Sequence, residues 1–245
     1  MSTSYMAEAS THADAPPRDL RGFWWVLLAV VAPIPGLALA LSNGFNPSEL
    51  GGSTRQTFED FAAHPEQGSL SLWFGAVFAI LAVPSGVAMM MATRRVAPRL
   101  STFVVGFVTF GFCAGVTAPN VVNLIALVTA EHDLDPSVGI TIADELFNSA
   151  FTNVAILPFF LTITIGRLLL GIVLWRVRIA PRWMAAAMIL ASPVEFILVG
   201  PFGNVGPTLS YGLTAIGFAS ASVALLRMSN DEFDVRPVAR ESVTV

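Results

Sequence analysis

The sequence predicts an all-α, polytopic membrane protein with six transmembrane helices and both termini in the cytoplasm. Of its 245 residues, 54% are hydrophobic and 12% are charged, whereas about 25% of the residues in a soluble domain are charged. The apolar residues form six runs, each close to the roughly 20 residues that a helix needs to cross a bilayer. Arginines cluster at alternate ends of these runs, as the positive-inside rule requires.

The six runs define one transmembrane domain over residues 22–228. The expected spans cover about residues 23–41, 70–92, 101–128, 149–175, 183–199 and 208–226. Residues 1–21 are expected to be a disordered cytoplasmic N-terminus and residues 229–245 a cytoplasmic tail. A cleaved signal peptide is the alternative for the first run, with Ala38-Leu39-Ala40 as the cleavage site. The spanning length of the run favours a membrane helix.

Two short helices are expected in the loops opposite the termini. Ser53-Thr54-Arg55-Gln56 resembles a capping box, in which side chains satisfy free N–H groups at a helix start. Phe58 and Phe61 fall on one side of this helix, which suits it to lie on the membrane surface or over the bundle. Before the fourth span, Asp135 can cap a second helix that has Pro136 at its first position.

Several spans contain residues that break helices or let them approach closely. Prolines lie inside five of the expected spans: Pro33, Pro35, Pro84, Pro119, Pro158 and Pro193. Broken helices can expose backbone groups for ion binding, but proline is also common in membrane helices, and we favour the second explanation. Gly111 and Gly115 form a G-x-x-x-G pattern in the third span, which permits close helix approach.

The predicted orientation rests on the distribution of charge and of tryptophan. Arginines flank the ends assigned to the cytoplasm: Arg18, Arg21, Arg94, Arg95, Arg99, Arg176, Arg178, Arg182 and Arg227. The opposite loops hold Arg55 and many carboxylates: Glu49, Glu59, Asp60, Glu66, Glu131, Asp133, Asp135, Asp144 and Glu145. Four tryptophans fall at inner boundaries and Trp73 at an outer one, as an aromatic belt requires. The inner ones are Trp24, Trp25, Trp175 and Trp183.

Two charged residues, Arg167 and Glu195, lie deep inside apolar runs. At 1.5 Å per residue, Arg167 is about 13 Å and Glu195 about 18 Å from the inner boundary. A lone charge at such depth costs at least about 2.5–3.5 kcal/mol, so pairing is the simplest solution. The pair can be a structural lock between neighbouring spans, or Glu195 can be a proton or cation site that Arg167 modulates. Snorkelling of Arg167 to the headgroups is a third alternative.

A polar stripe on the fourth span raises the possibility of an outward-facing vestibule. At 100° per residue, Ser149, Asn153 and Thr164 fall on the same side as Arg167, and Asn120 and Asn123 lie at a similar level on the third span. These residues can line a polar space above the charge pair. The alternative, which we favour, is ordinary hydrogen bonding between helices.

Residue types and motifs that the sequence lacks exclude several kinds of chemistry. Lysine is missing from the sequence, which excludes a Schiff base or a Walker A loop. The three histidines, His12, His64 and His132, lie outside the spans, which argues against a haem held by two histidines in the bilayer. No H-E-x-x-H motif or intramembrane Ser–His pair supports an enzyme. The outer carboxylates and His132 match no calcium loop, and we expect no metal, no cofactor and no nucleic acid.

Three features carry a family resemblance: the six-span layout, the outer helix after the first span, and one segment around the turn after span four. That segment is Gly171-Ile172-Val173-Leu174-Trp175-Arg176-Val177-Arg178-Ile179-Ala180-Pro181-Arg182-Trp183. They resemble a bacterial membrane family catalogued as domain of unknown function 4386, whose motif is a basic R-x-x-P-R turn after span four. The resemblance covers about residues 20–228 and implies a six-span helical fold. The family has no agreed activity, so the resemblance implies no catalytic residue.

Two functions therefore stay open for a multi-pass protein of a bacterial inner membrane. One is binding or transport of a small solute, proton or ion at Arg167 and Glu195. The other is a structural or regulatory role beside an oligomeric copy or another membrane protein, with the pair serving packing only. Direct contact in a packed core favours the second function, whereas a water-filled cavity favours the first.

Overall fold

The structure is a computed structural model that describes residues 20–115 and 117–229. The described part contains helices and no strands. The expected N-terminal segment lies outside the described residues except for its last two, and α1 already begins at Arg21. The expected tail lies outside them except for Ser229.

Six helical segments are long and apolar enough to cross a membrane, which confirms the predicted fold class. They are Gly22–Phe45, Pro65–Thr93, Pro98–Glu131, Thr152–Val177, Arg182–Phe202 and Val205–Leu226. Three spans are single helices: α4 (Pro65–Thr93), α10 (Arg182–Phe202) and α11 (Val205–Leu226). The first and the fourth spans are interrupted, and residue 116 within the third lies outside the described residues.

Each interrupted span consists of consecutive helical pieces. The first is α1 (Arg21–Val31) followed by α2 (Ile34–Phe45), and the fourth is α8 (Ala150–Leu161), a π-helical turn η1 (Thr162–Gly166) and α9 (Arg167–Val177). The described parts of the third span are α5 (Pro98–Gly115) and α6 (Thr117–Glu131). The first break falls at Pro33, which has no N–H to continue the helical hydrogen bonds. Pro84, Pro158 and Pro193 remain inside helices.

Two serines from neighbouring spans occupy the carbonyls that the first break leaves free. Pro33 has no N–H for the Ala29 carbonyl four residues earlier, and that oxygen accepts a hydrogen bond from Ser222 Oγ of α11 at 2.5 Å. The Ala32 carbonyl accepts from Ser85 Oγ of α4 at 2.6 Å. A buried carbonyl without a donor is costly, so these bonds stabilise the bend and join α4 and α11 to it.

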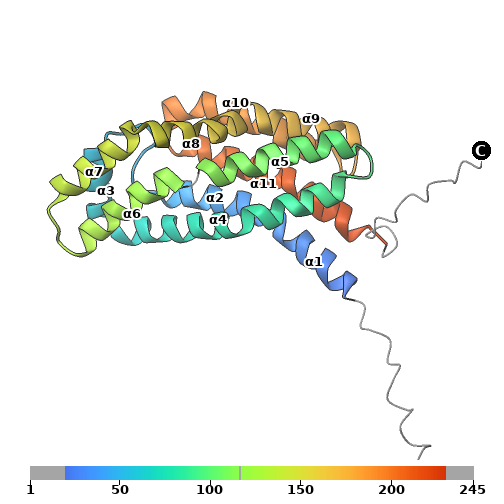
Figure 1. Cartoon of the computed structure of the whole chain (residues 1–245), viewed down its shortest axis with the longest axis horizontal. Coiled ribbons are helices and arrows are strands. Elements are labelled where there is room, and N and C mark those ends of the chain that lie inside the picture. The colour runs from blue at the N-terminus through green and yellow to red at the C-terminus, as the bar shows by residue number, and fades with distance from the viewer. Residues whose placement is uncertain (1–19, 116, 230–245) are drawn as a thin grey trace, which may run out of the picture.

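The two predicted loop helices are present as α3 (Thr54–Ala63) and α7 (Pro136–Asn148). Their caps form as predicted, because Ser53 Oγ accepts from Gln56 N at 3.2 Å and Asp135 Oδ1 accepts from Ser137 N at 2.9 Å. Both helices pack on the end of α6 through a second hydrophobic cluster. Its buried members are Phe58, Phe61, Val122, Ala126, Leu127 and Ala143. We call α3, α7 and this end of α6 the outer cap, which covers one end of the bundle (Figure 1).

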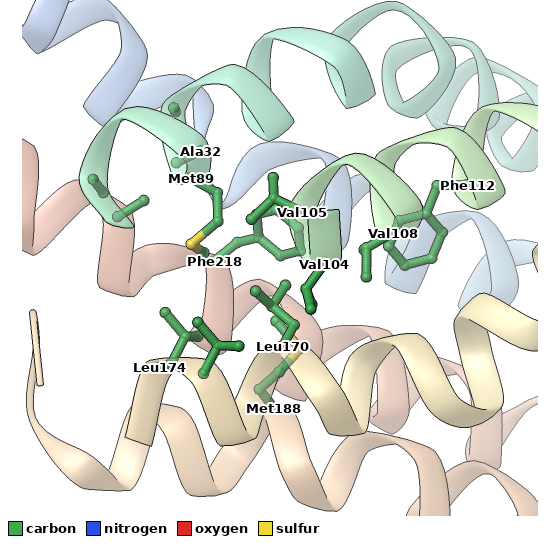
Figure 2. Packing of buried hydrophobic residues seen from close by; sticks show 14 of the residues in the cluster. Ala32, Met89, Val104, Val105, Val108, Phe112, Leu170, Leu174, Met188 and Phe218 are labelled. Atoms are coloured by element: carbon green, nitrogen blue, oxygen red, sulfur yellow. The ribbon is translucent and has the colours of Figure 1, made fainter. Parts of the chain in front are cut away.

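The main core lies between the spans, where α9 and α10 face α5 and α11. Figure 2 shows Leu170 and Leu174 of α9 pointing toward Val104 and Val105 of α5, all of them buried. The predicted close approach at Gly111 is confirmed, because a Cβ there would lie 2.6 Å from the carbonyl oxygen of Pro158 in α8.

The arginine-rich turns and the outer cap lie at opposite ends of the bundle. The α4–α5 and α9–α10 turns lie near the start of α1 and the end of α11 (Figure 1). The second turn begins at Arg178, whose φ of +55° ends α9 in a left-handed conformation. Acidic residues such as Glu131 and Asp144 lie at the other end. This separation agrees with the rule used to predict the topology, while the orientation in the membrane stays a prediction.

Candidate functional site

The candidate site lies where α9, α10 and α11 meet. α9 and α10 approach closely at Gly171, because a Cβ on this residue would lie 2.9 Å from the backbone nitrogen of Ile189. α10 and α11 form an antiparallel hairpin through the turn at Gly203, whose φ is +51°. This arrangement brings Arg167, at the start of α9, opposite Glu195 of α10.

Arg167 and Glu195 form a direct ion pair between Nη2 and Oε2. The structure thus brings together the two charges that the sequence singled out. Arg167 is 0% exposed and Glu195 is 6% exposed, so the guanidinium does not snorkel toward the headgroups. Burial this complete removes both charges from water, a cost that a pair recovers only with good geometry and further hydrogen bonds.

The π-helical turn η1 supplies one of those further partners. The N–H of Arg167 donates to Thr162 O, five residues earlier, instead of to Ile163 O, which a regular α-helix would use. The Ile163 carbonyl instead accepts the Arg167 Nε–H at 3.1 Å and one Nη2–H at 2.8 Å. It also accepts from Ser192 Oγ of α10 at 2.6 Å. Single π turns inside α-helices occur often at functional sites, and here the turn orients a carbonyl toward a buried cation.

Two hydroxyls of α11 complete the surroundings of Arg167. Its Nη1 donates to Ser210 Oγ at 2.6 Å and to Thr214 Oγ1 at 3.4 Å. With the bonds to Ile163 and Glu195, all five N–H groups of the guanidinium have protein acceptors. The guanidinium carbon also lies 5.3 Å from the centre of the Tyr211 ring, within the range of a cation–π contact.

Glu195 is less fully bonded than its partner. Oε2 accepts from Arg167 and lies 3.0 Å from Ser210 Oγ. Ser210 Oγ also lies 2.7 Å from the Ala191 carbonyl, so its one hydroxyl hydrogen serves one of these two acceptors at a time. Within residues 20–115 and 117–229, no donor contacts Oε1 of Glu195. The side chain is 8% exposed.

A small internal hollow lies next to this network. Tyr211 and Thr214 line it together with Ser85, Thr109 and the aromatic side chain of Phe112. Its free space is about 10 Å³, which is close to what a single water needs. It therefore does not offer room for an organic solute.

The predicted vestibule residues do not meet around one polar space. Ser149 caps α8, with its Oγ accepting from Thr152 N at 3.1 Å. Asn153 is exposed and donates to Ser149 O at 3.2 Å, and Thr164 donates to Phe160 O at 2.7 Å, both within their own span. Thr164 and Asn123 are partly buried. The vestibule stays a prediction. These contacts differ from the favoured alternative of hydrogen bonding between helices, because they lie within one span.

Asn120 lies elsewhere, in an apolar groove between α4 and α6. This groove has a volume of about 520 Å³ and is lined also by Trp73 and Leu124. The amide packs close to Gly75, where an added Cβ would lie 3.1 Å from it. This groove is lined by α4 and α6, whereas the charge pair lies on α9 and α10.

Sequence reasoning missed Ser192, Ser210, Thr214 and Tyr211 as members of the site. Ser210 and Thr214 are four residues apart and share one face of α11, and Ser192 precedes Glu195 by three residues on α10. Such spacing is a usable signal once the charge pair is known, because residues three or four apart face the same neighbour.

Among the described residues, no group of three or more His, Cys, Asp or Glu is arranged to hold a metal ion. The comparisons with known proteins give one match. A family model described as "Domain of unknown function (DUF4386)" matches residues 22–228. No curated protein and no solved structure matches the chain. The matched region contains all six candidate spans and both members of the charge pair, so the chain belongs to the DUF4386 family of integral membrane proteins.

Proposed function

We propose that this chain is a structural or regulatory partner in the membrane, in which the Arg167–Glu195 pair locks α9, α10 and α11 together. The observation that carries the proposal is the complete use of the Arg167 guanidinium by protein acceptors. A binding site for a solute needs donors or acceptors that are free for the ligand. Arg167 has none left to offer.

The surroundings of the pair support the same proposal. The hollow beside Tyr211 has room for about one water. The carbonyls of Ala29 and Ala32 at the first helix break accept from Ser222 and Ser85. In transporters with broken helices, such backbone groups coordinate ions, but here side chains of the protein already occupy these two.

A double replacement separates a packing role from a chemical one. Glu195→Gln is expected to lower the amount of folded protein in the host membrane, and Arg167→Met combined with Glu195→Leu is expected to restore it. If the pair serves packing only, the double variant also restores whatever phenotype follows deletion of the gene. Restored protein without restored phenotype would overturn the proposal.

A flux measurement tests the competing function directly. Vesicles that contain a pH-sensitive dye and the purified chain are given a potassium diffusion potential. We expect the same proton leak for the wild type, the double variant and protein-free vesicles. A leak of the wild type well above both controls would favour transport.

The second candidate function is a proton site at Glu195. It is favoured by Oε1, which has no donor among the described residues, on a side chain that is 8% exposed. This candidate predicts that Glu195→Asp retains function and that the apolar double variant does not. The two candidates therefore differ in the phenotype of the same double variant.

For the location, we propose a bacterial inner membrane with both termini in the cytoplasm. The support is the position of the arginine-rich turns at one end of the bundle and of the outer cap, whose sequence carries carboxylates, at the other (Figure 1), as the positive-inside rule requires. A fluorescent reporter that folds only in the cytoplasm, fused after Ser229, is expected to be bright. The same reporter inserted at Gly51 is expected to be dark, and the reverse pattern would refute the orientation.

A further inference from the structure

A hollow in the outer cap has the features of a site for an amphiphile. It lies between α6 and α7 and has a volume of about 540 Å³, within the roughly 300–1,000 Å³ of small-molecule sites. We call it the α6–α7 notch. Its apolar wall consists of exposed side chains that no other part of the described chain covers: Leu124, Val128, Leu134, Val138 and Ile142.

The floor of the notch is built by close packing of the two helices. A Cβ on Gly139 of α7 would lie 2.5 Å from the Phe58 ring and 3.2 Å from Thr129 Oγ1 of α6. Glycine thus allows α7 to lie directly against α6 and α3. The notch is a fixed feature of the outer cap, because the second hydrophobic cluster holds these three helices together.

Thr129 provides a polar group without a protein partner. The residue is 8% exposed, and within the described part of the chain its hydroxyl makes no hydrogen bond. It lines both the notch and an adjoining polar hollow of about 240 Å³ that also includes Asp133 and Leu134. A hydroxyl that lies between an apolar and a polar space suits a ligand that has both an apolar chain and a polar head.

The charge around the polar end favours a cationic head. Asp135 lines the notch itself, and Asp133 and the last residue of α6, Glu131, lie within four residues of it. Hydrogen bonds from the backbone and the side chain of Ser137 lower the pKa of Asp135 from its ordinary value, so this carboxylate is ionised at neutral pH. Arg55 of α3 and Asp135 both line a further hollow, on the α3 side of α7.

The notch also begins near the outer boundary of the membrane that the sequence predicts. Leu124 lines both the notch and the apolar groove that contains Trp73, an exposed residue at the expected outer boundary. An apolar chain in the outer leaflet therefore reaches the notch without crossing water. We propose that the α6–α7 notch binds a phospholipid that has an ammonium headgroup, with an acyl chain along Val138 and Ile142 and the ammonium beside Asp135. This proposal does not depend on the function proposed for the charge pair.

Binding is measured on the full chain, stripped of lipid in mild detergent and mixed with dioleoyl phosphatidylethanolamine or dioleoyl phosphatidylglycerol. Native mass spectrometry gives the fraction of protein that retains one lipid. We expect the ethanolamine lipid to be retained about two- to fivefold more than the anionic lipid, the ratio that an exposed ammonium–carboxylate pair supplies. Equal retention of the two lipids by the wild type would overturn the proposal.

Two variants separate the headgroup from the chain. Asp135→Asn removes the charge but keeps a good cap for α7, so it should abolish the preference between headgroups without unfolding the cap. Val138→Ser combined with Ile142→Ser should lower retention of both lipids. The control is Glu66→Gln, which removes an equal charge from the start of α4, away from the notch, and should leave the preference unchanged. A preference that survives Asp135→Asn, or that Glu66→Gln removes equally well, would assign it to the general charge of the cap and refute the site.

Discussion

The charge pair makes a strong prediction about stability. Glu195→Gln removes the counter-charge of Arg167 and leaves a guanidinium that is 0% exposed. Breaking a buried pair by removing one partner costs about 3–5 kcal/mol. The π-turn carbonyl and the α11 hydroxyls still contact the guanidinium, but they are neutral and do not replace the lost charge. We therefore expect the variant to lose about 3 kcal/mol or more of unfolding free energy.

Replacing both residues by apolar ones should largely reverse this loss. In the variant with Arg167→Met and Glu195→Leu, three polar neighbours keep a protein partner. Ser210 retains the Ala191 carbonyl, Thr214 retains the Ser210 carbonyl, and the Ile163 carbonyl retains Ser192. No buried polar atom in this group loses its last hydrogen bond, so the additional cost of about 1–3 kcal/mol for each unsatisfied group does not arise.

The assay is reversible unfolding in mixed micelles with increasing SDS, followed by tryptophan fluorescence. The wild type, Arg167→Met, Glu195→Leu and the double variant form a double-mutant cycle, which isolates the interaction between the two side chains. Glu66→Gln, at an exposed carboxylate, is the matched control and should change stability by less than about 0.5 kcal/mol. A loss below about 1 kcal/mol in Glu195→Gln would show that the pair is not coupled to folding and refute the reasoning.

Three further predictions concern the packing and the caps. Asn204→Ala should lower the unfolding free energy by about 1–3 kcal/mol. The Asn204 side chain donates to the Asn46 and Ser48 carbonyls at 3.2 and 2.7 Å and accepts from Leu50 N at 3.0 Å. An unchanged SDS midpoint would contradict this prediction. Gly111→Val should lower the unfolding free energy by about 1–3 kcal/mol, since a Cβ there would lie 2.6 Å from Pro158 O. Gly106 has open space around it, so Gly106→Ala should leave the unfolding free energy unchanged in the same titration. The α7 cap should depend on pH, because hydrogen bonds from Ser137 lower the pKa of Asp135 from its ordinary value. Its stabilisation is present above the pKa of the unfolded chain and is lost as the pH falls through the lower, folded-state pKa. Thermal unfolding between pH 5 and pH 2 should show a larger loss of stability in the wild type than in Asp135→Asn.

The spans and the charge pair could be predicted because each follows from one large free-energy cost: exposing apolar residues to water for the spans, and burying an unpaired charge in the membrane for the pair. Twenty apolar residues in a row have few alternatives to a membrane helix, and a charge as deep as Arg167 or Glu195 needs a partner. Both inferences hold without knowledge of how the helices are rotated. The structure confirms the six spans and shows the two charged groups in contact.

The details of the site depend on helix rotation, which the sequence does not determine. The predicted stripe assumed 100° per residue from Ser149 to Arg167. The π-helical turn η1 lies between them, and in it the N–H of Arg167 bonds to the carbonyl five residues earlier instead of four. Residues on either side of such a turn no longer share the expected face. As a result Arg167 is buried while Asn153 is exposed. Ser192, Ser210 and Thr214 could not be chosen from the many serines and threonines of the spans before this rotation was known.

The hydrogen bond between Ser222 and Ala29 has a consequence for how the protein is made. Ser222 lies in the last span and Ala29 in the first. A ribosome therefore synthesises the donor 193 residues after the acceptor. Until the last helix enters the bilayer, the Ala29 carbonyl must be satisfied by water, lipid headgroups or the insertion machinery. The first span therefore enters the membrane before its bend has all its partners, and the final span completes it.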